Sequence, residues 1–553
     1  MTSRICLAVL ACTLLLGLLI PVYTDEVAWR FAARAALDGV DRPVFVNCGA
    51  NTLAVPPLFI LALRNISAAT NLTLADPIYV RLAGVAWAIV WLSAVLLLIR
   101  TISRSHQERA TLTLLAVSLL SLGTLPLVLV MSRPEQPVLL ALTTAILIAL
   151  SGQVSGDPPS VRKSLAAAWG IALLGAVALA YHLKGVAYLP VFIACALLSS
   201  RGDAGRFARW SSAAGLVVMG AIAARYWIDR FKCPNDAVLA RLLAEHSIAA
   251  GSLDASGLAG RIAAASNPLS YVGLIVPRGR SGSDWLPPVS VTPLDWILAI
   301  GIPFAWFAGI ALAAACLVRA ATSQRHGALP MRLLVLGVTI VVVLAVWGFT
   351  QVHRNFYEAG LFLPMLLIAI ILLVRGANLP ENALSKVGRA AAVAAALGAF
   401  SQLVVISKYM PSLLGSARQA GYIDAQRHSI SPFGYAALEQ QIIATGKLCG
   451  IDPQQRLRSL LIDDLTYFAY MRSYRPLHHL GIVSIWNGEI RDPLAYLKQQ
   501  GSSGAVLGCK YLSPEMRAGA KQSGEFCCLG ASDLTDLSAA QAQVLNRLLL
   551  TER

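Results

Sequence analysis

The chain has 553 residues, of which 57% are hydrophobic and only 13% are charged, and its mean hydropathy is +0.65. This composition excludes an ordinary soluble globular protein and indicates a polytopic membrane protein. The formal net charge of +16 gives no support to nucleic-acid binding. Much of that charge lies in short loops between apolar runs, where Lys and Arg face an anionic membrane surface.

Continuous apolar runs predict about eleven membrane-spanning helices, because a helix needs about 20 residues to cross the hydrocarbon layer. The runs lie near 5–23, 78–99, 110–130, 136–151, 164–181, 185–199, 208–226, 294–318, 330–350, 357–374 and 388–407. The first run follows Arg4 as in a signal peptide, but no small-x-small cleavage site follows it. We therefore expect an uncleaved first helix.

The short connections predict the orientation, because Lys and Arg accumulate in cytoplasmic loops. If the N-terminus is cytoplasmic, the inside loops hold Arg100, Arg104, Arg109, Arg162, Lys163, Arg201, Arg206, Arg209, Arg319, Arg325, Arg332, Arg375, Lys386 and Arg389. The alternate short loops hold only the isolated cations Arg133, Lys184 and Arg354. The sequence therefore predicts a cytoplasmic N-terminus and an outer C-terminal tail. Heavy use of Arg and Ala favours a bacterial inner membrane, with the tail in the periplasm.

Two long loops, 24–77 and 227–293, fall on the predicted outer side. In the first, the stretches 27–37 and 53–64 indicate two short helices that lie in the headgroup plane and wall a cavity. The second loop fits a mobile lid or a plain excursion between helices about equally well.

The chain divides into a predicted transmembrane domain, 1–407, and a soluble extracytoplasmic α/β domain, 408–553. In the tail, strands are predicted at 459–463, 480–484, 504–508 and 526–529, and helices at 465–472, 493–500, 514–522 and 539–550. This alternation predicts a largely parallel sheet. Asp463 and Asp464 stand where a strand ends and a helix begins. A ligand site is conceivable there, but a helix N-cap is the better interpretation.

Six cysteines lie in the predicted outer segments: Cys48, Cys233, Cys449, Cys509, Cys527 and Cys528. In an oxidising compartment such cysteines form disulfides. Cys48 and Cys233 are one candidate pair, and Cys449 or Cys509 would join the vicinal pair in the tail. The spacing of these residues does not indicate a zinc site.

The predicted outer face gathers acids, cations and histidines. Asp25 and Glu26 stand just past the first apolar run, where a carboxylate pair is costly unless it binds something. The later loops add Arg133, Glu135, His182, Lys184, His353, Arg354 and Glu358. Arg and Lys suit phosphate oxygens, and an Asp suits a general base.

Each motif also has a structural interpretation. The acidic pair would favour the dipole of a helix start. The Arg–Glu turn would form a local ion pair before a helix that starts at Pro134, the His–Lys segment would snorkel at the interface, and the last group would link helices. Their coincidence on one predicted face favours a functional interpretation.

In this order, the motifs resemble those of the GT-C superfamily of membrane glycosyltransferases, which includes protein O-mannosyltransferases and bacterial lipid A aminoarabinose transferases. The matching segments are Asp25 with Glu26, the turn from Arg133 to Glu135, His182 and Lys184 followed by Pro190, and Arg354, Asn355 and Tyr357 followed by Pro364. The resemblance covers the membrane portion and leaves the tail as a variable accessory domain. The Trp-Trp-Asp signature of oligosaccharyltransferases is absent, which argues against transfer to asparagine.

The resemblance implies a hexosyl- or pentosyltransferase of cell envelope glycan biosynthesis. It would move a sugar from a polyprenyl-phosphate donor to a hydroxyl of a lipid, glycan or protein acceptor at the outer face. Base-assisted displacement of a cation-stabilised phosphate predicts inversion.

The resemblance also implies roles for the individual residues. Asp25 would be the general base, and Glu26 would support the acceptor or a metal. A divalent cation, Mg²⁺ or Mn²⁺, fits this pair but is not required. Donor phosphate binding falls to Arg133, Lys184, Arg354, His182 and His353, with Glu135, Asn355, Tyr357 and Glu358 in support.

Other functions compete with glycosyl transfer. A transporter or flippase of lipid-linked saccharides also needs cations at a membrane face, but transporters place them near the midplane and often contain inverted repeats. An O-antigen-ligase-like enzyme using a diphosphate-linked donor is the nearer rival among transferases. In a third alternative, the chain is an assembly protein whose C-terminal tail carries the function, and Asp25 would then be dispensable.

Overall fold

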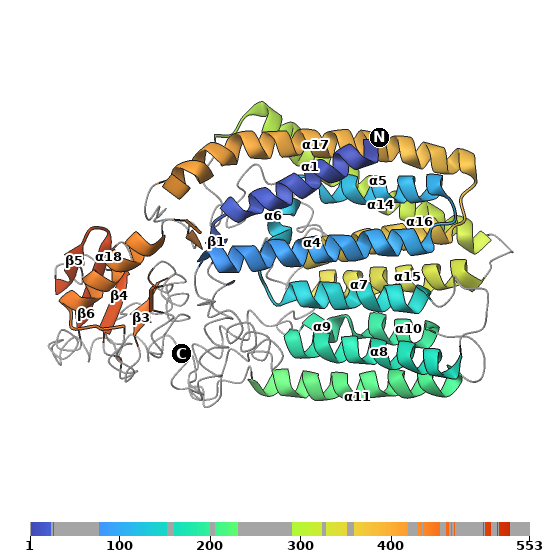
Figure 1. Ribbon diagram of the computed structural model, residues 1–553, viewed down its shortest axis with the longest axis horizontal. Helices are drawn as coiled ribbons and strands as arrows, with labels where there is room; N and C mark the ends of the chain where they lie inside the picture. Colours follow the sequence, from blue (N-terminus) through green and yellow to red (C-terminus); the bar gives the residue numbers. More distant parts are fainter. Residues whose placement is uncertain are drawn as a thin grey trace, which may run out of the picture.

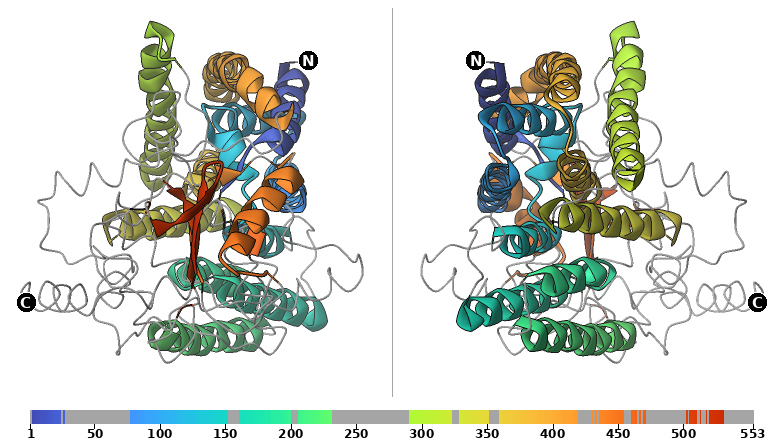
Figure 2. Two further views of the ribbon diagram at one scale, coloured as in Figure 1. Left: turned by 90° about the vertical axis from the view of Figure 1, so that its left-hand side faces the viewer. Right: turned by 90° about the vertical axis from the view of Figure 1, so that its right-hand side faces the viewer.

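The computed structural model describes residues 2–23, 26, 77–151, 160–182, 184–199, 205–230, 290–322, 328–350, 359–418, 429–430, 432–433, 435–453, 460–463, 466, 469–470, 502, 504–509, 512, 517 and 519–530. Helices form a long bundle, and a small mixed sheet lies at one end of it (Figure 1). We call this end the sheet-facing end. Viewed from there, the strands lie in front of the helices (Figure 2).

The bundle consists of α1 (Thr2–Leu16), α4 (Pro77–Ile102), α5 (His106–Leu120), α6 (Leu125–Leu129), α7 (Glu135–Ser151), α8 (Val161–Tyr181), α9 (Lys184–Ala187), α10 (Leu189–Leu198), α11 (Arg206–Arg230), α14 (Pro293–Thr322), α15 (Ala328–Thr350), α16 (Ala359–Gly376) and α17 (Glu381–Arg418), with a 3-10 turn η1 (Gly17–Leu19) after α1. Within the described residues, seven helices are long and apolar enough to cross a membrane: α4, α8, α11, α14, α15, α16 and α17. Three shorter apolar helices are α1, α7 and α10. The chain is therefore compatible with a multi-pass helical membrane protein.

Each of the eleven predicted apolar runs contains helical residues, but the first run ends in η1 and a short strand, the run 185–199 is divided between α9 and α10, and the count of eleven spans is not confirmed. The run 110–130 is divided between α5 and α6, because Gly123 adopts a positive φ of 59° that few other residues tolerate. The amide of Gln402 on α17 donates to the carbonyls of Ser121 and Gly123, at 2.7 Å each. These bonds satisfy carbonyl groups that the broken helix leaves open.

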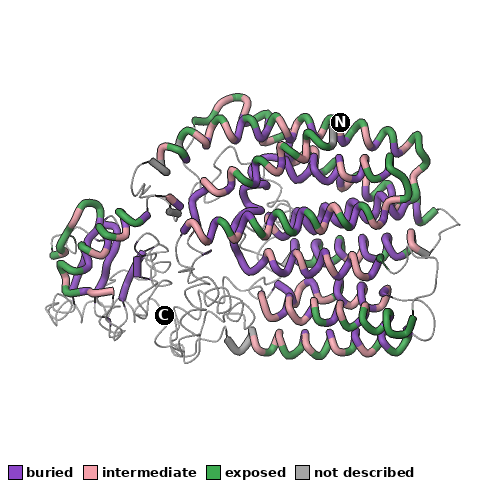
Figure 3. The backbone as a smooth tube through the Cα atoms, in the orientation of Figure 1, coloured by how far each residue is buried: buried purple, intermediate pink, exposed green. Residues whose placement is uncertain are grey.

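Helix α16 forms the centre of the bundle. Of its apolar window, 89% is buried, against 28% for α11 and for α14. Figure 3 shows the same contrast between a buried interior and outer helices with exposed faces. Helix α17 continues past the predicted domain boundary at 407 to Arg418.

The C-terminal unit, as we call it, comprises β2 (Ser429–Ile430), α18 (Tyr435–Leu448), β3 (Leu461–Ile462), β4 (Gly504–Gly508), β5 (Lys521–Ser523) and β6 (Phe526–Gly530). Its four-stranded sheet has the order β3-β4-β6-β5. Only β3 and β4 pair in parallel; β4 with β6 and β5 with β6 are antiparallel. The prediction of a largely parallel sheet is thus wrong for the described strands.

Two details of this unit differ from the sequence prediction. The predicted helix 514–522 ends too late, because 521–523 form strand β5, which turns into β6 through Gly524 with a positive φ of 59°. A two-residue hairpin turn needs such a conformation, and glycine supplies it. Helix α18 was not predicted at all, although it packs on the sheet.

Two disulfides stabilise this unit, Cys449–Cys528 and Cys509–Cys527. Successive residues of a strand point to opposite faces of a sheet. The vicinal cysteines of β6 therefore bind partners on opposite faces. The expected pairing of the tail cysteines with this vicinal pair is confirmed, whereas Cys48 and Cys233 lie outside the described residues.

Candidate functional site

Glu26 is fully buried and receives donors from several segments. Its Oε2 lies 2.5 Å from Nη2 of Arg81, which is also fully buried on α4. The backbone N–H of Ser132 donates to Oε1 at 2.6 Å, and that of Tyr23 donates to Oε2 at 2.9 Å. These bonds neutralise the carboxylate and fix its orientation.

Arg81 also donates to backbone carbonyls on both sides of Glu26. Its Nη1 donates to the carbonyl of Val130 at 2.8 Å, and its Nη2 donates to that of Pro21 at 3.1 Å. The sequence analysis missed Arg81. The signal was present, since an Arg inside an apolar run is expensive in a membrane and marks a partnered or functional position.

A second cluster forms around Glu135 at the first turn of α7. Arg133 donates from Nε to Oε2 at 3.2 Å and from Nη2 to Oε1 at 3.1 Å. Lys184 Nζ donates to Oε1 at 2.8 Å. All three side chains are buried, with exposed fractions of 10% or less. The local Arg–Glu ion pair anticipated as an alternative is therefore present, but it also recruits a lysine from another helix.

His182 joins this cluster as a neutral ring. Its Nδ1 accepts from the backbone N–H of Lys184 at 3.0 Å, so Nδ1 carries no proton and the hydrogen of the neutral ring lies on Nε2. Nε2 is 3.9 Å from Oε1 of Glu135. Burial lowers the pKa of His182 from 6.5 to about 3, despite the opposing effect of the Glu135 carboxylate.

The backbone between α8 and α10 explains the position of Lys184. Helix α8 ends at Tyr181, and His182 is extended at its C-cap, with φ of −160°. Gly185 packs so tightly that a Cβ there would lie 2.6 Å from the carbonyl oxygen of Ala178. The ammonium of Lys184 lies 5.9 Å from the ring centroid of Trp347 on α15, within cation–π range. Trp347 is a second contact that the sequence analysis missed.

The turn from Val130 to Glu135 connects the two clusters. Glu26 accepts from Ser132, and the next residue, Arg133, belongs to the Glu135 cluster. The structure thus brings together five residues of the predicted site: Glu26, Arg133, Glu135, His182 and Lys184. The other predicted residues, Asp25, His353, Arg354, Asn355, Tyr357 and Glu358, lie outside the described residues, as do both predicted interfacial helices of the first loop and the second outer loop between α11 and α14.

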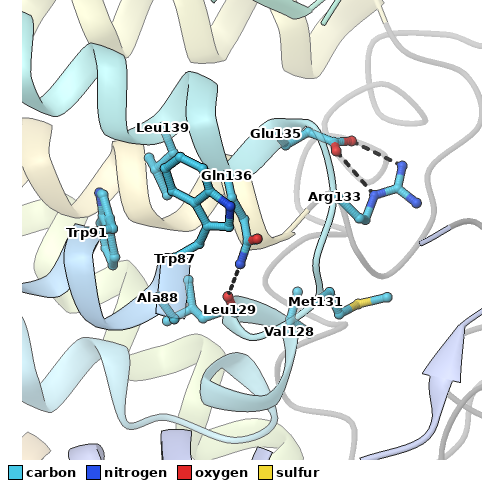
Figure 4. Close-up of a pocket in the computed structure, with 11 residues that line it drawn as sticks. Trp87, Ala88, Trp91, Val128, Leu129, Met131, Arg133, Glu135, Gln136 and Leu139 are labelled. Atoms are coloured by element: carbon cyan, nitrogen blue, oxygen red, sulfur yellow. Dashed lines mark hydrogen bonds and ion pairs between the residues drawn. The ribbon is translucent and has the colours of Figure 1, made fainter. Parts of the chain in front are cut away.

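Arg133 and Glu135 line a small pocket of about 20 Å³, which has room for about one water molecule. Its walls are mostly apolar and come from α4, α6, α7, α16 and the turn before α7, but they include Arg133, Glu135 and Gln136, and the ring of Trp87 lies beside Gln136 (Figure 4). Gln136 Nε2 donates to the carbonyl of Leu129 at 2.8 Å. Arg133 and Glu135 of the charged cluster therefore border a mostly apolar pocket.

Among the described residues, no group of three or more His, Cys, Asp or Glu side chains has the geometry to hold a metal ion. Both oxygens of Glu26 accept hydrogen bonds from nitrogen donors. A cation at the acidic pair would therefore compete with these donors for the same carboxylate.

Asp463 in the C-terminal unit has a structural role. Its Oδ1 accepts from the backbone N–H of Thr466 at 2.8 Å, which is a helix N-cap bond. Its Oδ2 accepts from the N–H of Gly508 at 2.6 Å and so joins two strand ends. The N-cap interpretation is confirmed for Asp463.

No protein-family model matches this chain, and no curated protein sequence matches it.

Proposed function

We propose that this protein is a membrane glycosyltransferase with a GT-C-like architecture that uses a polyprenyl-phosphate sugar donor. The observation that carries the proposal is the convergence of Arg133, His182 and Lys184 on Glu135 at one end of a membrane-compatible bundle. Arg133 comes from the turn before α7, and His182 and Lys184 come from the segment after α8. A buried carboxylate that gathers three such nitrogen-bearing side chains marks a candidate functional site.

The cluster has the chemistry to hold a phosphodiester. Arg133 and Lys184 carry two positive charges and Glu135 one negative charge, while His182 is neutral, so these four residues carry one net positive charge. This charge complements a phosphodiester monoanion, and Nε2–H of His182 supplies a neutral donor. Glu135 orients both cations before the donor arrives.

In this proposal, Asp25 accepts the proton of the acceptor hydroxyl as it attacks the anomeric carbon. The bond from that carbon to the phosphate oxygen breaks, and Lys184, Arg133 and Arg354 stabilise the departing polyprenyl phosphate. His353 hydrogen-bonds this phosphate. One displacement inverts the anomeric configuration, and a bound Mg²⁺ or Mn²⁺ is not required.

The proposal also covers topology and location. The sheet-facing end is the outer face of a bacterial inner membrane, the N-terminus is cytoplasmic and the bundle has about eleven spans. The part of the chain after α17, which ends at Arg418, then forms a periplasmic α/β domain. The distribution of loop cations and the two disulfides in the C-terminal unit support this orientation.

Sugar transfer in proteoliposomes tests the proposal. Asp25→Asn should lower kcat at least about a hundredfold by removing the base, and Lys184→Ala should weaken donor binding and raise KM. Lys163→Ala is the matched control, because Lys163 is exposed at the opposite end of α8. Full transfer by Asp25→Asn would overturn the catalytic assignment.

One observation favours the rival transporter function: the helix break between α5 and α6 is buried and polar, as in proteins that move substrates. Sealed vesicles separate the two activities. Movement of labelled polyprenyl-phosphate sugar across the bilayer without a change in its chemistry would identify a transporter and contradict glycosyl transfer.

A further inference from the structure

Strand β2, at the start of the C-terminal unit, pairs with the segment that precedes the acidic pair. Strand β1 (Val22–Tyr23) pairs antiparallel with β2, with Val22 opposite Ile430 and Tyr23 opposite Ser429. The pairing joins the exit of the first apolar helix to the start of the C-terminal unit.

Side chains reinforce this pairing. Val22 and Val80 are fully buried and belong to the same apolar core as Tyr435, Leu438 and Ile442 of α18. Val80 lies in the first turn of α4, a helix whose other buried apolar residues pack in the bundle core. The core of the C-terminal unit is thus completed by two residues of the membrane portion.

The same contacts lead into the candidate site. Val80 precedes Arg81, which binds Glu26, and the N–H of Tyr23 donates to Glu26 at 2.9 Å. Glu26 in turn accepts from Ser132, next to Arg133. Therefore one turn of α4 places one side chain in the apolar core shared with the C-terminal unit and the next on the acidic segment.

We propose that the C-terminal unit is a positioning part of the transfer site and that Val22 and Val80 are positioning residues. The unit holds Val22 and Tyr23 by strand pairing, and Glu26, which accepts from Tyr23, contacts the turn that carries Arg133. This inference rests on the proposed function and adds a role for the tail, which the resemblance treats only as a variable accessory.

Hydrogen exchange tests the positioning without any assay of transfer. Val80→Ala should loosen the apolar core that Val80 shares with Val22 and α18 and speed exchange in the peptide that contains Tyr23. Val85→Ala is the matched control, because Val85 is a buried valine of the same helix that packs in the bundle core. Equal exchange in Val80→Ala and wild type would overturn the inference whatever the activity.

Kinetics test the consequence for the reaction. Val80→Ala should lower kcat about tenfold, because small misplacements of catalytic groups are costly, and should leave the KM for the donor unchanged. Because a loss of active molecules also lowers the apparent kcat at unchanged KM, kcat is calculated per folded molecule, and Val85→Ala shows the effect of a core truncation alone.

A cross-link should rescue the loosened variant. Val22 and Ile430 are directly opposite in an antiparallel pair, so cysteines at both positions have side chains on the same face. The disulfide formed by Val22→Cys and Ile430→Cys should restore the kcat of Val80→Ala, and reduction should remove the gain. No rescue by a formed cross-link would contradict positioning through β2. Absence of transfer in the wild type would instead overturn the proposed function, and the exchange experiment would still decide whether the unit holds the segment.

Discussion

At the scale of single residues, two buried glutamates organise the candidate site in different ways. Glu26 pairs with Arg81 and joins the end of the first helix to the 130–132 turn. Glu135 holds Arg133 and Lys184. The first contact fixes the backbone, and the second gathers two cations around one carboxylate.

The Glu26–Arg81 pair predicts an asymmetric response to mutation. Arg81→Met should destabilise the protein by about 3–5 kcal/mol, because it leaves the Glu26 charge buried without its partner. Glu26→Gln combined with Arg81→Met should recover part of this loss, since no buried charge then remains. Thermal unfolding in detergent measures both, and equal losses in the single and double variants would argue against a buried charge pair.

His182 predicts a pH dependence of stability. Its folded pKa of about 3 lies below the ordinary value of 6.5, so the unfolded chain takes up a proton first as the pH falls. The stability contributed by the neutral ring is present above about pH 6.5 and is lost as the pH falls toward about 3. His182→Asn should therefore lose less stability than the wild type between about pH 7 and about pH 4. His106→Asn is the control, because His106 is exposed at the start of α5; equal pH dependence of wild type and His182→Asn would contradict a buried neutral ring.

At the scale of elements, apolar runs located the helices but not their places in the bundle. Helices α14 and α16 are both strongly apolar, yet only α16 is enclosed. In a bilayer, a lipid-facing surface is as apolar as a buried one. Composition therefore does not distinguish the centre from the periphery, and only the packing of neighbours does.

Helix α4 packs so closely against the backbone of Val130 that we expect position 84 to require glycine. A Cβ at Gly84 would lie 1.9 Å from the carbonyl oxygen of Val130, a backbone atom beside the candidate site. Gly84→Ala should therefore destabilise the protein and displace the 130–135 turn. Gly170→Ala on α8 is the matched control, because nothing lies within 4 Å of its Cβ position. It should be neutral or stabilise by up to about 1 kcal/mol; similar thermal stability of the two variants would contradict this packing.

At the scale of the whole molecule, bonds and packing join the two ends of the chain. Strand pairing joins β1 to the C-terminal unit, and a shared apolar core joins α4 to it. Figure 1 shows β1 and the start of α4 at the sheet-facing end of the bundle. Two disulfides link the ends of α18 and β4 to β6 within the unit and so support its apolar core.

We expect the two disulfides to contribute unequally to the free energy of unfolding. Cys449 and Cys528 are 79 residues apart, whereas Cys509 and Cys527 are 18 apart. In the chain-entropy model, the longer loop contributes about 1.3 kcal/mol more stability. Replacing both cysteines of the 449–528 pair by Ala should thus lower the unfolding free energy more than the same change at 509 and 527. A larger loss for the shorter loop would show that local packing, rather than loop length, dominates.

The sequence by itself determined the apolar helices, strands β4 and β6 and the Asp463 cap, because these depend on local patterns of polarity and propensity. It named Cys449 and Cys509 as candidate partners of the vicinal cysteines, but the structure decided which cysteine pairs with which. It also singled out five residues that the structure brings together. Only the tertiary structure decided that Arg81 neutralises Glu26, that Lys184 reaches Glu135, that α16 is central and that Val22 and Val80 complete a distant core. These contacts join residues that are far apart in the chain, and no local pattern records which buried partner a charge or an apolar side chain will meet.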